Sequence, residues 1–169
     1  MRGQPSPLAA AGPDEGPAPG AGHSPRTPLP AALLAKPVLV IEDEALIAWM
    51  VESLLEDLGF ETIAIAASAR EARVMAGQAA PGLVISDINL GFGVPDGIET
   101  VTSLAVAPEV PIVFITAHAN PANADRIEMA FARHAILAKP VLIEPLGAAI
   151  LRLATRAPMP STCPKMEQK

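Results

Sequence analysis

Short apolar runs alternate with amphipathic segments along the middle of the chain. Runs rich in Val, Ile and Leu are typical of strands buried on both faces. They predict five strands, at residues 38–41, 60–66, 83–87, 110–115 and 135–138. After the first run, Ile47, Val51, Leu54 and Leu58 recur at three- and four-residue spacing, which predicts a helix over 45–58.

Residues that favour helix starts follow the other runs. Ser68 and Asp96 are each followed three residues later by Glu, the pattern of a capping box. Asn120 is an N-cap residue, and Pro121 fits the first helical position. These signals predict one helix that begins at residue 68 and two more over 96–105 and 120–133. A last helix is predicted after Lys139-Pro140, ending at about residue 157. Five such β/α repeats with short connections predict an α/β fold with an open parallel sheet sandwiched by helices.

Proline separates this middle part from the two ends of the chain. Residues 1–36 hold eight of the 19 prolines, and residues 158–169 hold three. Because 1–36 shows no apolar periodicity, we expect a disordered Pro/Ala/Gly-rich extension there or an upstream translated segment. The expected organisation is therefore a folded domain over 37–157, followed by a flexible tail over 158–169.

Composition and charge narrow the possible functions. The 169 residues suit one domain, and half of them are hydrophobic. Residues 37–157 contain seven basic and fifteen acidic side chains, a net charge of −8, which argues against nucleic acid as a partner. The single cysteine, Cys163, excludes an internal disulfide. No apolar stretch has the ~18 residues of a membrane span, so we expect a cytoplasmic protein.

Reactive side chains follow four of the predicted strands, where a parallel sheet places its ligand site. They are Glu42, Asp43, Asp87, Thr116 and Lys139. Three close carboxylates repel by ~4 kcal/mol per pair at an effective dielectric near 20, so a cation must stabilise them. Mg2+ prefers carboxylate and phosphate oxygens. A carboxylate beside a bound cation, an amine and a hydroxyl can attack phosphorus, which makes Asp87 the candidate nucleophile.

Five motifs carry a resemblance to a known family. They are VLVIEDE (38–44), LVISDINL (83–90), PDGIE (95–99), PIVFITA (111–117) and LAKP (137–140). Residues 37–157 resemble the receiver domain of bacterial two-component response regulators. The resemblance implies a flavodoxin-like doubly wound sheet with strand order 2-1-3-4-5 and five helices.

The same resemblance implies a role for each site residue. Glu42 and Asp43 match the acidic Mg2+-binding pair, and Asp87 matches the phosphoacceptor, which also binds the metal. Asn89 matches the residue whose backbone carbonyl reaches the metal. Thr116 matches the switch hydroxyl. Lys139 matches the phosphate-binding lysine, and its peptide bond to the next residue, Pro140, is expected in the cis form.

Two departures from the family pattern concern the way the phosphorylated state is read out. The loop after the phosphoacceptor is two residues longer, so it either reshapes partner docking or is a tolerated insertion. Ile136 stands where the family has a switch aromatic, so any rearrangement must use side chains such as His118, Phe131 or Ile136, or be weak. His118 itself is either a residue that tunes loss of the phosphoryl group or a solvated loop histidine. We expect Trp49 to be partly buried.

The leading hypothesis is a single-domain response regulator, a phosphoacceptor switch with no separate substrate. A sensor histidine kinase or histidine phosphotransfer protein would supply the phosphoryl group to Asp87, and a protein target would receive the output. One alternative is a receiver-like module that binds partners without phosphorylation. Another is an aspartyl-phosphate phosphatase of the haloacid dehalogenase kind, although Asn89 stands where that family has its second Asp.

Overall fold

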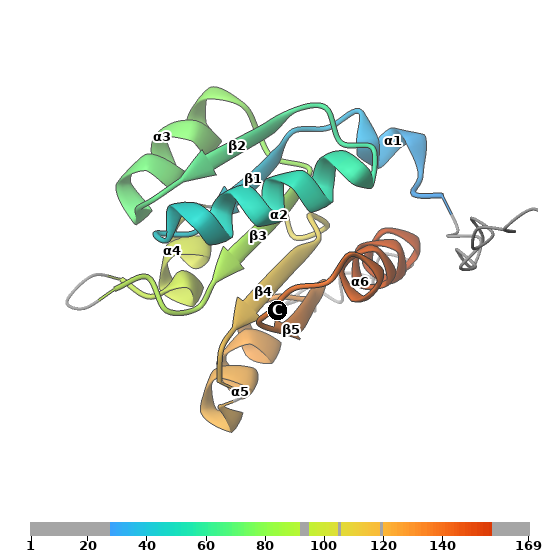
Figure 1. Ribbon diagram of the computed structural model, residues 1–169. Coiled ribbons are helices and arrows are strands. Elements are labelled where there is room, and N and C mark those ends of the chain that lie inside the picture. Colours follow the sequence, from blue (N-terminus) through green and yellow to red (C-terminus); the bar gives the residue numbers. More distant parts are fainter. Residues whose placement is uncertain (1–27, 92–94, 105, 119, 157–169) are drawn as a thin grey trace, which may run out of the picture.

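Five parallel strands form one sheet in the order β2-β1-β3-β4-β5 (Figure 1). The computed structural model describes residues 28–91, 95–104, 106–118 and 120–156. The strands are β1 (Val38–Ile41), β2 (Ile63–Ala66), β3 (Leu83–Asp87), β4 (Ile112–Thr116) and β5 (His134–Ala138). The predicted fold class and strand order are confirmed. The predicted tail over 158–169, and the part of the predicted extension up to residue 27, lie outside the described residues.

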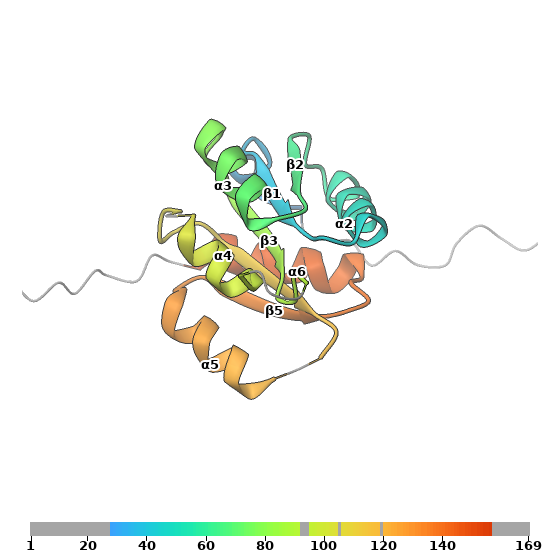
Figure 2. The same cartoon turned by 90° about the vertical axis from the view of Figure 1, so that its left-hand side faces the viewer.

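Helices cover both faces of the sheet (Figures 1 and 2). They are α1 (Ala31–Leu34), α2 (Ala45–Asp57), α3 (Ala69–Gln78), α4 (Gly97–Ser103), α5 (Pro121–Ala130) and α6 (Ile143–Thr155). One buried cluster joins Val38 and Val40 to residues of α2 and α6, and the other joins Leu39 and Ile41 to residues of α3, α4 and α5. No helix in the described ranges is both long enough and apolar enough to cross a membrane.

The side chains of β1 pack against helices on both faces of the sheet, so every residue of the strand is apolar. Successive side chains of a strand point to opposite faces, and both faces are covered by helices. All four residues of β1 are accordingly buried. The register places Ile41 beside Ser86 of β3, and Thr116 of β4 beside Ala138 of β5. The residues that end these strands therefore meet at one edge of the sheet.

The predicted helix starts are confirmed. The Ser68 hydroxyl accepts a hydrogen bond from the backbone N–H of Glu71, and Asp96 and Glu99 form a complete capping box. The Asn120 side chain accepts from the N–H of Ala122 at the start of α5. The ends were harder to predict: α5 stops at Ala130, three residues before the predicted end, because the next residue takes an extended conformation.

The folded part begins earlier than the sequence predicted, and this adds a sixth helix. The segment 28–36, which we call the N-terminal clasp, contains α1 and packs against the cluster under α2 and α6. Leu29 and Leu33 are buried in that cluster. The aliphatic part of Lys36 lies against Gly82, where a Cβ would be only 2.3 Å from the Lys36 Cβ. The prolines of 1–36 hid this short apolar segment, so the predicted boundary at residue 37 was wrong.

The expectation for Trp49 was also wrong. Trp49 lies on the outer face of α2 with 62% of its surface exposed, and Leu46 on the same face is 78% exposed. The helix packs through Ala48, Val51 and Leu55 instead. Residues three and four positions apart share a helix face, so these two side chains form part of an apolar surface patch.

The clasp leads to a first prediction. Replacing Leu33 with Ala leaves a cavity, and we expect the free energy of unfolding to fall by about 2 kcal/mol, the lower end for buried Leu→Ala changes. Urea denaturation measures this change. Leu46→Ala is the matched control, since an exposed side chain should alter stability by less than about 0.5 kcal/mol. Equal stability of the two variants would show that the clasp does not contribute to the core.

Candidate functional site

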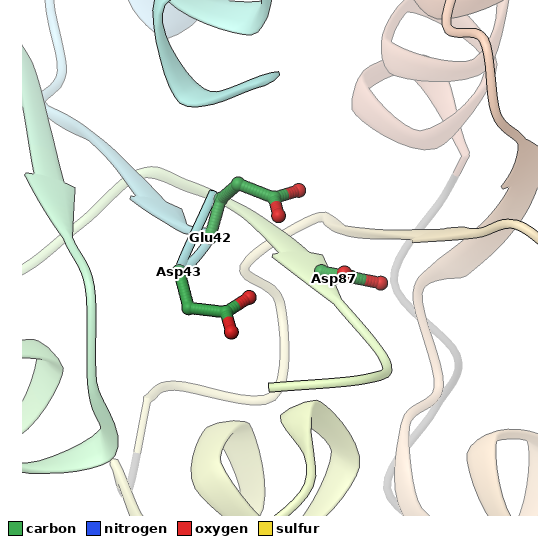
Figure 3. A group of neighbouring side chains, drawn as sticks. All are labelled: Glu42, Asp43 and Asp87. Carbon is green, nitrogen blue, oxygen red and sulfur yellow. The ribbon is translucent and has the colours of Figure 1, made fainter. Parts of the chain in front are cut away.

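Three carboxylates from two adjacent strands converge at the carboxyl edge of the sheet (Figure 3). Glu42 and Asp43 directly follow β1, and Asp87 is the last residue of β3. One oxygen from each of the three lies within 4.8 Å of the others. Glu42 and Asp87 are buried, while Asp43 is exposed. The negative charge is thus concentrated in a site that is open on the Asp43 side.

One amine faces the two buried carboxylates. The Lys139 Nζ lies 2.8 Å from Asp87 Oδ2 and 2.9 Å from Glu42 Oε2. The backbone N–H of Lys139 donates to the Thr116 carbonyl at 2.8 Å, which holds the lysine at the end of β5. The Lys139-Pro140 peptide bond is cis, as predicted. Lys139 therefore bridges the first, third and fifth strands.

Burial and pairing shift two pKa values in this group. Burial raises the pKa of Glu42, and the hydrogen bond from Lys139 opposes that rise only in part. Burial lowers the pKa of Lys139, but its hydrogen bonds to Asp87 and Glu42 outweigh this effect, so the net shift is upward. Lys139 consequently stays protonated at neutral pH. A single positive charge then balances three carboxylates, which leaves a net negative site suited to a hard cation.

Backbone contacts hold Asp87 in place. Its Oδ1 accepts a hydrogen bond of 3.1 Å from the backbone N–H of Asn89. The start of α4 packs directly against the end of β3: the Gly97 N–H donates to the Ile88 carbonyl at 2.9 Å. A Cβ at position 97 would be 1.8 Å from the Asp87 carbonyl oxygen. Only glycine fits this close approach, which explains the glycine of the PDG motif.

Thr116 lies on the same edge, but its hydroxyl is engaged elsewhere. It donates to the His118 carbonyl at 2.9 Å and accepts from the His118 N–H at 3.2 Å. The His118 side chain is exposed. Next to Thr116 lies a cavity of about 290 Å3, lined almost entirely by apolar surface and bordered by Ile88, Ile136 and the first turns of α5. Ile136 is 38% exposed and leaves this space unfilled.

The structure thus brings Glu42, Asp43, Asp87 and Lys139 into one group, with Asn89 joined to it by a backbone hydrogen bond. The individual roles of these five residues, and those of Thr116, His118 and Ile136, stay predictions. Sequence reasoning missed an ion pair between helices, in which Arg126 of α5 binds Asp96 at the start of α4. The capping-box pattern identified Asp96, but no local signal could identify a partner 30 residues away.

Comparison with known proteins agrees with this geometry. The model of the response regulator receiver domain family matches residues 38–151. The phyllosphere-induced regulator PhyR of Methylorubrum extorquens is 40% identical over 112 residues, which make up 65% of this chain and 40% of that protein.

Two solved structures have the same fold. Chemotaxis protein CheY4 of Vibrio cholerae is 28% identical with a TM-score of 0.62, over 70% of this chain and 98% of that one. The anti-anti-sigma factor PhyR from Bartonella quintana is 31% identical with a TM-score of 0.57, over 70% of this chain and 47% of that one. This chain spans less than half the length of either PhyR protein. Because the family match covers all five strands and both halves of the acidic site, the chain belongs to the response regulator receiver domain family.

Proposed function

We propose that this protein is a cytoplasmic phosphoacceptor switch rather than an enzyme with a separate substrate. In this proposal a sensor histidine kinase or histidine phosphotransfer protein supplies the phosphoryl group, and Asp87 accepts it. The observation that carries the proposal is the position of the Asp87 carboxylate, 2.8 Å from the Lys139 amine and within 4.8 Å of two further carboxylates. This arrangement supplies a nucleophile, a fixed positive charge and oxygen ligands for a cation.

The proposed transfer forms one bond and breaks another. A carboxylate oxygen of Asp87 attacks phosphorus and forms the P–O bond, while the P–N bond of the phosphohistidine breaks and the electron pair returns to the imidazole. Lys139 then neutralises part of the charge on the phosphoryl oxygens. Glu42, Asp43 and Asp87 would hold Mg2+, with the Asn89 carbonyl as the predicted additional ligand. When bound, Mg2+ offsets the negative charge shared by the carboxylates and the phosphoryl group.

The phosphoryl group would change contacts at Thr116. It adds ~−1.5 to −2 of charge at the end of β3. The Thr116 hydroxyl could donate to a phosphoryl oxygen only by giving up its hydrogen bond to the His118 carbonyl. The turn that leads from β4 into α5 would then rearrange. The proposed output is therefore a change in protein contacts at the α5 side of the domain.

The apolar patch on α2, which consists of Leu46, Trp49 and Met50, supports docking of the phosphodonor beside Asp43. Residues 37–69 contain seven acidic residues and no Lys or Arg. A partner that covers this patch must therefore combine apolar side chains with a basic rim. Trp side chains frequently dominate the affinity of such contacts.

Two other functions make different predictions. A phosphorylation-independent binding module would bind its partner equally well without an acceptor carboxylate, and the absence of an aromatic at Ile136 favours this reading. A phosphatase would turn over phosphate monoesters repeatedly. The Bartonella protein is described as an anti-anti-sigma factor. An anti-sigma factor is therefore one downstream target to test.

The first test concerns the acceptor. Incubation with acetyl phosphate and Mg2+ should produce one slower band on a Phos-tag gel, and Asp87→Asn should abolish it because an amide cannot form the acyl phosphate. Asp125→Asn, at an exposed position on α5, is the matched control and should keep the band. A shift that survives Asp87→Asn excludes the assignment.

The second test concerns the metal. Without Mg2+, Asp43→Asn should unfold at a higher temperature than the wild type, because one of three mutually repelling charges is removed. At a Mg2+ concentration 100 times the Kd, the wild type should gain about 2.7 kcal/mol and Asp43→Asn much less. Thermal unfolding with Mg2+ and with EDTA measures both effects. Asp57→Asn, exposed at the far end of α2, should respond to Mg2+ like the wild type; an equal response of Asp43→Asn would contradict the metal assignment.

The third test concerns docking. For a purified histidine kinase that phosphorylates the wild type, Trp49→Ala should lower the rate of transfer at limiting concentration about 10- to 30-fold, the loss of a hot-spot side chain. Phosphorylation by acetyl phosphate should be unchanged, since that donor needs no docking. Val74→Ala, at a position 53% exposed on α3, is the control. An unchanged transfer rate for Trp49→Ala would place docking elsewhere.

A further inference from the structure

Helix α5 is held to the domain by few buried side chains. Ile127 is its one buried residue, whereas α4 buries four residues and α6 buries another four. Figures 1 and 2 show α5 at the outer end of the layer, beside β4 and β5. Elements with few buried contacts are those that move at low cost. The position of α5 must therefore depend on its remaining contacts.

The first turns of α5 lie beside empty space. The cavity of about 290 Å3 next to Thr116 is bordered by Pro121, Asn123 and Ala124 of α5. Its opposite side includes Ile136 of β5, the position at which the sequence lacks an aromatic. The start of α5 therefore has room to move toward the sheet when the Thr116 hydroxyl changes partner.

Further along α5, one side chain joins the helix to the start of α4. The Arg126 guanidinium donates to Asp96 Oδ2 at 2.7 Å and lies 3.8 Å from Glu99 Oε1. Asp96 is the N-cap of α4 and directly precedes Gly97, which packs on the Asp87 carbonyl. Arg126 is thus connected to the acceptor through two consecutive residues and the packed backbone of β3.

We propose that Arg126 is a positioning residue, which sets the resting position of α5 by its ion pair with Asp96 and so couples α5 to the state of Asp87. The proposal rests on the proposed function only for the response to phosphorylation. In the resting state Arg126 holds the middle of α5 while Thr116 and His118 hold the turn before it. Phosphorylation then releases the Thr116 contact, and the first turns of α5 shift into the adjacent cavity.

Exposure limits the size of this effect. The side chains of Arg126 and Asp96 are 41% and 31% exposed, and exposed pairs shift an equilibrium only about two- to five-fold. Such a shift matters for a helix with one buried anchor. The free energy of unfolding of the whole domain would change little, because the core contributes most of it. A measurement that reports on α5 alone is therefore required.

Amide hydrogen exchange of the full chain tests the proposal. In the wild type, acetyl phosphate with Mg2+ should change the exchange rate of α5 peptides. In Arg126→Gln, α5 should exchange about two- to five-fold faster before any phosphorylation, and phosphorylation should change it less. Arg126→Lys keeps the positive charge, so its α5 exchange rate should lie between those of the wild type and Arg126→Gln. Asp96→Asn keeps an N-cap but removes the carboxylate, so its α5 should exchange faster than in the wild type, by less than in Arg126→Gln. Arg70→Gln, at an exposed position on α3, should match the wild type.

The outcomes separate this inference from the proposed function. If α5 exchanges in Arg126→Gln as in the wild type, in both states, the positioning role is wrong even when Phos-tag gels show that Asp87 is phosphorylated. If the wild type shows no phosphorylated band, the proposed function fails, and faster α5 exchange in unmodified Arg126→Gln would still support the resting-state contact. Equal acceleration across all peptides of Arg126→Gln would indicate general destabilisation and would also overturn the proposal.

Discussion

The dominant constraint on this structure is the negative charge of three carboxylates at the carboxyl edge of the sheet. Parallel strands end at the same edge, so the acidic residues that follow β1 and end β3 are forced together. Burial makes the charge on Glu42 costly and raises its pKa. Lys139 offsets part of that cost through two close contacts, but one amine cannot neutralise three carboxylates. The remaining negative charge suits the site for a cation.

The site around Asp87 and the part of the domain around α5 are built differently. The Asp87 site is tightly packed, because Asp87 lies in a buried strand, Gly97 packs on its backbone, and Lys139 contacts its side chain. The part around α5 is more loosely packed, since α5 has one buried residue and a cavity lies between its first turns and Thr116. Ile136 does not fill the cavity as an aromatic could.

Two features of the domain do not contact the acidic site. The N-terminal clasp extends the core beyond residues 38–151, the part matched by the family model. The apolar patch on α2 remains exposed because the opposite face of the helix, with Val51 and Leu55, already fills the core. Both features are amphipathic segments. The sequence pattern alone does not distinguish an apolar side chain that is buried in the core from one that stays exposed.

The sequence alone was enough to predict the five strands and the helices that follow them, the limits of β3, the helix caps and the charged group, but it did not predict α1. These follow from local patterns: continuous apolar runs, capping residues and acids at strand ends. Only the folded structure shows which charges pair, that Arg126 binds Asp96, that Leu33 is buried and that Trp49 is exposed. Pairing and burial depend on contacts between residues that are distant in the chain, and no local spacing encodes those contacts.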